Sequence, residues 1–230
     1  MLLSDVPFDE APYRFSGNVY GILLNHRDAL AALGGAVNEP PYKAPPRAVV
    51  LYVKPRNTLI GPGADVPVDV DAPELEVGAS LGLVIGRTAC RVNEADALDH
   101  LAGYTIVNDI SVPHASFYRP QIRFKARDRS CAIGPRVVAR RAVAEPGRLV
   151  VRVYVDGRLA HENATSGLIR PVARLLAEVS DFMTLLPGDV LMAGVAHGAP
   201  KVRAGQHVAI EIDGLGRLEN RIVDTREVAA

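Results

Sequence analysis

The stretch that decides the fold of this chain is GYTIVNDISVPHASFYRPQIRFKARDRSCAIGP, at residues 103–135. It starts with a short apolar run at residues 104–107, which is typical of a buried strand, and a carboxylate, Asp109, follows that run closely. A tyrosine–arginine pair and a cluster of basic and acidic residues come next. A hydrophobic core alone does not need such a sequence. We therefore interpret the stretch as one wall of a pocket for an acidic small molecule.

Asp109 is open to two interpretations. A carboxylate at the end of a strand can bind a metal ion or a polar substrate. The pair Asn108-Asp109 can also form a turn in which both side chains hydrogen-bond the local backbone. The spacing by itself favours the turn.

Three basic residues alternate in the second half of the stretch, namely Arg123, Lys125 and Arg127. In a strand all three would point to one face, where the arginines could bind carboxylates and a desolvated Lys125 could transfer protons. A solvated strand face is the common alternative. Tyr118 and Arg119 favour a pocket, because tyrosine and arginine together suit a planar acidic ligand.

Further candidate residues lie outside this stretch. His26 follows a strand-like segment and could act as a base near neutral pH, although a lone histidine more often makes structural hydrogen bonds. Glu74 and Glu76 would share one face of an extended segment, as metal binding requires, or they could be the solvated acids of a loop. His197 could reach a site or lie in a surface turn.

The rest of the chain predicts a β-rich fold. Its 20 glycines and 17 prolines are spread along the sequence, as many short strands and turns require. Asp156-Gly157 is a strong hairpin signal, whereas residues 169–179 carry apolar side chains at helical spacing. Many short strands against two or three helices favour an α+β, mostly β domain.

Composition limits the classes of function. Lysine plus arginine and aspartate plus glutamate each number 26, and the resulting net charge of zero argues against bulk binding of nucleic acid or of a membrane surface. The apolar runs are too short to span a bilayer, and the N-terminus lacks the apolar core of a secretory signal. Cys90 and Cys131 have neither redox nor zinc spacing, and we expect them to be reduced in a cytoplasmic protein, with one disulfide as the alternative.

Short motifs along nearly the whole chain resemble those of the fumarylacetoacetate hydrolase family. Their order and spacing are specific when taken together: Lys54-Pro55, residues 81–86, residues 103–109, Lys125 with Asp128, residues 133–135, Ser180 with residues 186–189, and residues 216–220. The segments LNHRDAL, PYKAPP, KPRNTLIG and SFYRP are similar, more narrowly, to the N-terminal half or separate N-terminal subunit of the bifunctional isomerase/decarboxylase of 4-hydroxyphenylacetate degradation.

The resemblance implies a fold of layered β-sheets rolled around a pocket, with a few peripheral helices. Residues 1–15 would form an N-terminal arm, and residues 16–230 a single catalytic domain.

The resemblance also implies site residues. Family members hold Mg²⁺ or a similar divalent ion through three carboxylates, and the ion stabilises an enolate. Asp109 falls on one of these ligands and Lys125 on the family's active-site lysine. The other two ligands, a Glu-x-Glu pair, fall on Gly78 and Ser80, and a histidine that many members use falls on Ala29.

These departures leave His26 as the candidate for proton transfer, beside Lys125 and Asp109. The candidates for binding the carboxylates of a substrate are Tyr118, Arg119, Arg123 and Lys54. Two further family motifs are altered and here read Gly194-Val195-Ala196 and Pro113-His114.

In function, the resemblance implies a lyase/isomerase subunit that acts on 5-carboxymethyl-2-oxo-hex-3-ene-1,7-dioate or 2-hydroxyhepta-2,4-diene-1,7-dioate through an enolate. One alternative is a non-catalytic partner of a paralogue that retains the three carboxylates. Another is a C–C hydrolase of the acylpyruvate type. We expect a small anionic 2-oxo or 2-hydroxydienoic acid as the ligand, and a homodimer or a complex with a paralogous subunit as the assembly.

Overall fold

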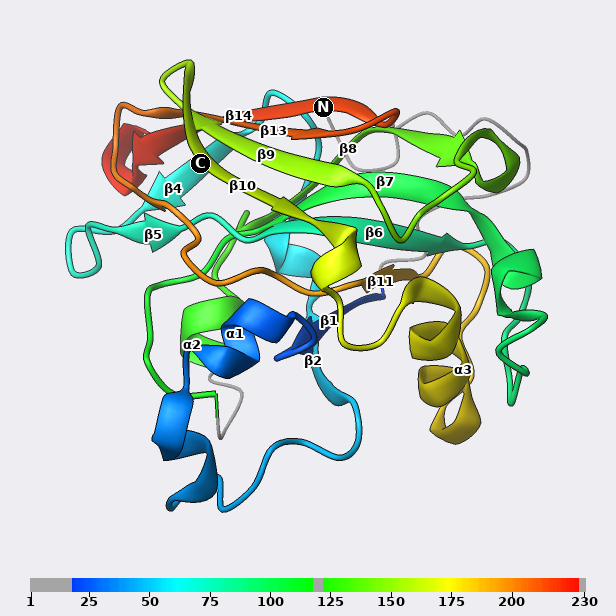
Figure 1. The fold of residues 1–230 in the computed structure, drawn as a ribbon. Helices are drawn as coiled ribbons and strands as arrows, with labels where there is room; N and C mark the ends of the chain where they lie inside the picture. Colours follow the sequence, from blue (N-terminus) through cyan, green and yellow to red (C-terminus); the bar gives the residue numbers. More distant parts are fainter. Residues whose placement is uncertain (1–17, 118–121, 228–230) are drawn as a thin grey trace.

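The computed structural model describes residues 18–117 and 122–227, and their arrangement is shown in Figure 1. Strands make up most of the regular structure, which confirms the expected α+β, mostly β class. The arm predicted at residues 1–15 lies outside the described residues.

The larger sheet contains seven strands in the order β2-β1-β11-β6-β7-β8-β3. Their bounds are β1 Val19–Leu23, β2 Val50–Lys54, β3 Leu59–Ile60, β6 Ala79–Ile85, β7 Leu101–Asp109, β8 Cys131–Ala139 and β11 Val190–Met192. The pairs β1–β11 and β3–β8 are parallel, and the other neighbours are antiparallel. The strand expected at residues 104–107 is confirmed, since it forms the middle of β7, which is buried along its whole length.

A second sheet contains five strands in the order β10-β9-β13-β14-β4, and a small third sheet pairs β12 with β5. Their bounds are β4 Asp65–Val68, β5 Leu75–Glu76, β9 Val150–Val155, β10 Arg158–Ala164, β12 Lys201–Val202, β13 His207–Ile212 and β14 Gly216–Asp224. The hairpin predicted at Asp156-Gly157 joins β9 to β10. Both turn residues have positive φ, 50° and 77°, as a tight two-residue hairpin turn requires.

Three α-helices occur in the described part of the chain, α1 Arg27–Ala31, α2 Ile122–Lys125 and α3 Val172–Phe182. The 3-10 helices are η2 Gly34–Asn38, η3 Arg56–Thr58, η4 Ala97–His100, η5 Arg140–Ala142, η6 Thr165–Gly167 and η7 Thr225–Glu227. The helix expected at residues 169–179 corresponds to α3, which begins only after Pro171. Its apolar stripe of Val172, Leu175, Leu176 and Val179 is buried, as the spacing predicted.

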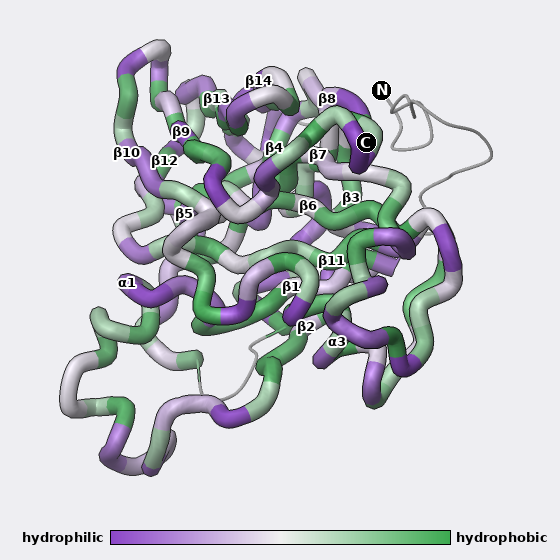
Figure 2. Tube along the Cα trace, turned by 45° about the vertical axis from the view of Figure 1, so that its right-hand side comes forward, coloured by the Kyte–Doolittle hydropathy of each residue, from purple (hydrophilic) through white to green (hydrophobic). Residues whose placement is uncertain are grey.

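The core lies between the two larger sheets. In Figure 1 the five-stranded sheet lies above β6, β7 and β8, while α1, α2 and α3 lie on the lower side of the molecule. Side chains such as Ile106 of β7 and Ile210 of β13 belong to one cluster of buried residues that draws on both sheets. Hydrophobic colour follows β6 and β11 through the interior in Figure 2. None of the helices in the described ranges is long and apolar enough to cross a membrane.

Candidate active site

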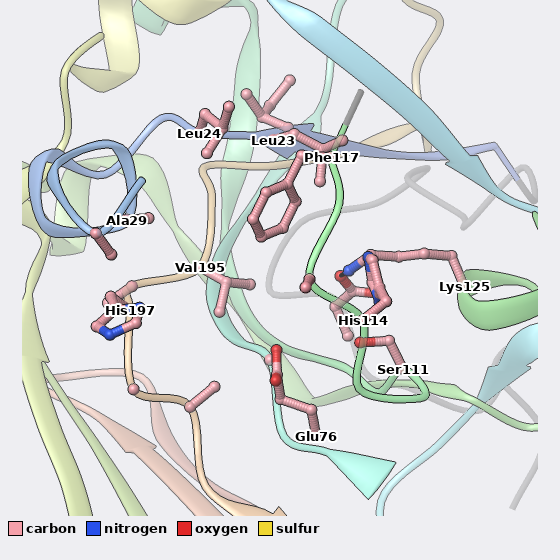
Figure 3. Close-up of a pocket in the computed structure, with 18 of the residues that line it drawn as sticks. Leu23, Leu24, Ala29, Glu76, Ser111, His114, Phe117, Lys125, Val195 and His197 are labelled. Carbon is pink, nitrogen blue, oxygen red and sulfur yellow. Dashed lines mark hydrogen bonds and ion pairs between the residues drawn. The ribbon is translucent and has the colours of Figure 1, made fainter. Parts of the chain in front are cut away.

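A cavity of about 390 Å³ lies next to the C-terminal end of β7. Segments that are far apart in the sequence meet around it, and Figure 3 shows their side chains. The polar side chains of its lining are those of Tyr52, Glu76, Asp109, Ser111, His114, Lys125, His197 and Lys201. Its apolar side includes Leu23, Leu24, Ala29, Phe117 and Val195. Such a mixture of an apolar wall and a few convergent polar groups is typical of a small-molecule site.

Asp109 is the buried anion of this cavity. Its carboxylate lies 2.9 Å from the ammonium of Lys125 and 3.1 Å from that of Lys54, and the hydroxyl of Tyr52 donates a hydrogen bond to it. Burial by itself raises the pKa of the Asp109 carboxyl, but Lys125, Lys54 and the Tyr52 hydrogen bond outweigh it and lower that pKa to about 2. Asp109 is therefore a fixed negative charge that holds two lysines in place.

Tyr52 reaches Asp109 because of a glycine on the neighbouring strand. Gly21 of β1 is the cross-strand partner of Tyr52 on β2, and a Cβ at position 21 would lie only 2.0 Å from the tyrosine ring. The ring thus lies across the bare backbone of β1. Burial and the charge of Asp109 raise the pKa of the Tyr52 hydroxyl well above its usual value, so the hydroxyl stays protonated and donates.

Lys54 was predicted to bind substrate, and the structure places it elsewhere. Its side chain is fully buried, is absent from the cavity lining, and donates to the backbone oxygens of Ile110 and Lys125 and to the hydroxyl of Ser130. These bonds fasten the segment after α2 to the end of β7. Every donor position of the Lys54 ammonium faces protein, and its part in substrate binding stays a prediction.

Lys125 is the last residue of α2, and its ammonium faces the cavity. The alternating basic residues do not share the face of a strand, since residues 122–125 are helical. Arg123 is exposed and does not line the cavity, and Arg127 pairs with Asp69 at 2.6 Å. Alternation over so few residues fits a helical turn as well as a strand. Tyr118 and Arg119 lie outside the described residues.

His26 is buried beside the cavity but does not line it. Its Nδ1 lies 2.5 Å from a carboxylate oxygen of Asp28, and its Nε2 lies 3.2 Å from the carbonyl oxygen of Ala164. The same Asp28 oxygen accepts the backbone N–H of His197 at 3.0 Å. This arrangement matches the structural interpretation of His26, which orients an aspartate that in turn holds the loop around His197.

Several lining residues were not selected as site residues from the sequence. The Nδ1 of His114 lies 2.8 Å from the carbonyl oxygen of Val112, which can only accept, and the His114 ring stacks on Phe124 with centroids 5.5 Å apart. Strand pairing brings Ser111 and Lys201 to the cavity, and no local sequence pattern predicts that pairing. Glu76 and His197 could be recognised in the sequence as polar residues next to predicted strands. Their position in the sequence did not show in which direction their side chains point.

Comparison with known proteins agrees with this geometry. A family model described as fumarylacetoacetate (FAA) hydrolase C-terminal matches residues 18–223. The chain belongs to the fumarylacetoacetate hydrolase family.

The relatives of this fumarylacetoacetate hydrolase family member include longer proteins. The 4-hydroxyphenylacetate degradation bifunctional isomerase/decarboxylase of Escherichia coli is 40% identical over 212 residues, which are 92% of this chain and 48% of that protein. The chain therefore spans about half the length of this relative. The resemblance expected from the motifs is confirmed, for the family and for the likeness to part of the bifunctional enzyme.

Solved structures show the same fold. The 5-carboxymethyl-2-hydroxymuconate delta-isomerase of Mycobacterium smegmatis matches with a TM-score of 0.78 and 30% identity, over 94% of this chain and 81% of that one. The 2-hydroxyhepta-2,4-diene-1,7-dioate isomerase of Mycobacterium marinum matches with a TM-score of 0.75 and 29% identity, over 94% and 77% of the two chains. Both likenesses confirm the expected fumarylacetoacetate hydrolase-like architecture.

One solved structure with this fold contains a divalent metal ion. A fumarylpyruvate hydrolase from Pseudomonas aeruginosa was solved with Mn²⁺ and pyruvate, and it matches this chain with a TM-score of 0.79 over 95% of this chain and 94% of that one. Its 23% identity shows the shared fold alone.

The residues of this chain do not fit such an ion. A side chain at Gly78 has no room, because a Cβ there would lie 2.3 Å from the backbone oxygen of Asp109. Ser80 accepts the backbone N–H of Gly194, and the carboxylate of Asp109 is already in contact with two ammonium groups and a phenol. Within residues 18–117 and 122–227, no three His, Cys, Asp or Glu side chains are grouped so that they could hold a metal ion. One oxygen donor surrounded by cations is a poor site for a hard divalent cation.

Proposed function

We propose that this chain is an isomerase/decarboxylase subunit of 4-hydroxyphenylacetate catabolism. Its substrates would be the tricarboxylate 5-carboxymethyl-2-oxo-hex-3-ene-1,7-dioate, the dienol 2-hydroxyhepta-2,4-diene-1,7-dioate, or both. The observation that carries the proposal is the ammonium of Lys125, which faces the cavity and is held at 2.9 Å by the buried carboxylate of Asp109. The activities of the named relatives support it.

Both reactions need a cation at the 2-oxo oxygen. In the decarboxylation, the bond between C5 and its carboxylate breaks, CO2 leaves, and the electron pair passes through the C3–C4 double bond to the 2-oxo oxygen. The product of that step is a dienolate. The ammonium of Lys125, whose side chain is largely buried, stabilises the negative charge that develops on the oxygen. Asp109 fixes the position of this ammonium before the substrate binds, so little reorganisation is needed during the reaction.

The remaining carboxylates of the substrate need partners of their own. Lys201 lines the same cavity as Lys125 and supplies a second ammonium group. The apolar side, with Leu23, Phe117 and Val195, would cover the hydrocarbon part of the substrate. A cavity of about 390 Å³ has room for a molecule of this size.

The test is the release of CO2 from the tricarboxylate by the purified chain. Lys125→Met should lower kcat by about 100-fold, because it removes the group that stabilises the developing oxyanion. Lys125→Arg should retain part of the activity, since the positive charge is kept. The control is Lys43→Met, which changes an exposed lysine outside the cavity and should leave kcat unchanged. A Lys125→Met protein that is as active as the wild type would overturn the proposal.

A non-catalytic role beside a paralogue is the second candidate. Two points favour it: Gly78 and Ser80 stand where the sequence resemblance implies a glutamate pair, and the chain spans about half of the bifunctional relative. If this role is correct, the chain alone releases no CO2, and a mixture with the paralogous half is equally active with wild-type or Lys125→Met chain. If Lys125→Met lowers the activity of the mixture, the site of this chain takes part in catalysis.

A further inference from the structure

The carboxylate of Glu76 points into the middle of the cavity (Figure 3). It comes from β5, whereas Lys125 enters from α2, so the two charged groups reach the same space from different elements. Within the described ranges, the Glu76 carboxylate makes neither a hydrogen bond nor an ion pair. A carboxylate that faces a cavity without a partner is available to a ligand.

The backbone of Glu76 is held from both sides. Its N–H donates to the carbonyl of Ser111 at 2.7 Å, and the N–H of Ser111 donates back to the Glu76 carbonyl at 3.1 Å. On the other side, Glu76 is the cross-strand partner of Lys201 in the β5–β12 pair. Ser111 and Lys201 also line the cavity, so strand pairing fixes three polar lining residues relative to one another.

The neighbouring acid, Glu74, has a different environment. Its carboxylate pairs with Arg203 at 2.8 Å and with Lys201 at 3.8 Å, and it does not line the cavity. These contacts lower the pKa of the Glu74 carboxyl, chiefly through the hydrogen bond from Arg203. The two glutamates of this short segment therefore differ: Glu74 is paired with basic side chains, whereas Glu76 faces the cavity.

The proposed isomerisation requires a group in that position. Conversion of the dienol to the 2-oxo-3-ene product breaks the O–H bond at C2 and forms a new C–H bond at C5. Lys125 lies at the oxygen end, where it stabilises the charge, but the carbon end needs a group that can hold and release a proton. Ala29 of the lining carries no titratable group, and His26 is engaged with Asp28 and Ala164 outside the cavity.

We propose that Glu76 transfers the proton to and from C5 of the dienolate. In its protonated form, the Glu76 carboxyl gives its proton to C5. The electron pair of the C4–C5 double bond forms the new C–H bond, the C3–C4 double bond appears, and the oxygen at C2 becomes a carbonyl. The carboxylate left on Glu76 recovers the proton released from the enol oxygen, so the net change in protons is zero. The reverse reaction uses the carboxylate as the base at C5. This assignment rests on the proposed function and names the acid–base group of the same site.

The two reactions separate this role from that of Lys125. Loss of CO2 needs only a cation at the oxygen, whereas isomerisation also needs proton transfer at carbon. Glu76→Gln should therefore slow conversion of the dienol by about 100-fold or more while CO2 release from the tricarboxylate changes by less than about threefold. Deuterium incorporation at C5 of the product, followed by NMR in D2O, should fall in parallel with the isomerisation.

The matched control is Glu74→Gln, which makes the same chemical change two residues away and outside the cavity; both activities should stay within about threefold of the wild type. Glu76→Asp, which keeps the carboxylate, should restore part of the isomerisation, and thermal unfolding of each variant checks the fold. If Glu76→Gln slows both reactions equally, or neither, the assignment of Glu76 is wrong while the proposed function stands. A wild-type chain that turns over neither compound would overturn the proposed function, and the assignment with it.

Discussion

Asp109 and Lys54 show how single buried charges shape the site. Asp109 lies between two ammonium groups, and only that of Lys125 faces the cavity. Lys54 balances the same carboxylate from the protein side, where it also satisfies the carbonyl of Ile110 and the hydroxyl of Ser130. One lysine is thus available to a substrate and the other holds the loop that carries it.

We expect Lys54→Met to destabilise the protein by about 3 kcal/mol. The change leaves buried hydrogen-bond acceptors without a donor and removes one of the two positive charges beside Asp109. Urea unfolding would measure this loss, with the exposed Lys43→Met as the control. KM should change little under conditions in which the variant is folded. An unchanged stability with a KM raised tenfold or more would instead show that Lys54 contacts the substrate, as the sequence resemblance predicted.

At the level of strands and helices, close approach of backbones decides which side chains are possible. The N–H of Asp109 donates to the carbonyl of Gly78 at 2.9 Å, which brings the end of β7 against the residue just before β6. Gly21 in the same way leaves room for the ring of Tyr52. At both places the glycine leaves space that a side chain would fill. The backbone oxygen of Asp109 occupies this space at Gly78, and the ring of Tyr52 occupies it at Gly21.

Gly78→Ala should therefore destabilise the fold by about 2 kcal/mol, since a Cβ placed 2.3 Å from a backbone oxygen forces the strands apart. Gly147→Ala serves as the control, because a Cβ at that position would meet nothing within 4 Å. The free energy of unfolding of both variants is the quantity to compare. Equal stability of the two would show that the end of β7 can move, and that a glutamate at position 78 could be accommodated.

The whole molecule brings together the ends of β5, β7 and α2 and the loop before β12, and this assembly determines whether a metal can bind. Lysines surround Asp109, which the sequence resemblance implies as a metal ligand. The other two positions for which the resemblance implies ligands hold Gly78 and Ser80.

Purified protein should accordingly contain much less than one divalent ion per chain by elemental analysis, and EDTA should alter neither its thermal midpoint nor its CO2 release. Added Mn²⁺ at millimolar concentration should not raise the midpoint, because a ligand stabilises a fold only when it binds the native state. Stoichiometric metal, or activity that EDTA abolishes and Mn²⁺ restores, would contradict the donor arrangement described above.

Sequence reasoning was most successful where one local pattern has one structural meaning. The apolar run of β7, the Asp156-Gly157 hairpin and the stripe of α3 depend on periodicity and turn chemistry, which act over a few residues. It did not resolve residues 123–127, because three basic residues that alternate over five positions do not separate a strand from a helical turn. It did not identify Tyr52, because the function of that tyrosine depends on a glycine in another strand.

By itself, the sequence determined the β-rich class, the family, and the two charged residues, Asp109 and Lys125, that meet at the end of β7. Only the tertiary structure decided that Lys54 supports the loop after α2, that His26 orients Asp28, and that Glu76 faces the cavity while Glu74 does not. The physical reason is that the direction of a polar side chain depends on strand pairing and close backbone contacts between distant segments. Local patterns fix which residues share a face, but the partner strands decide whether that face meets protein, solvent or substrate.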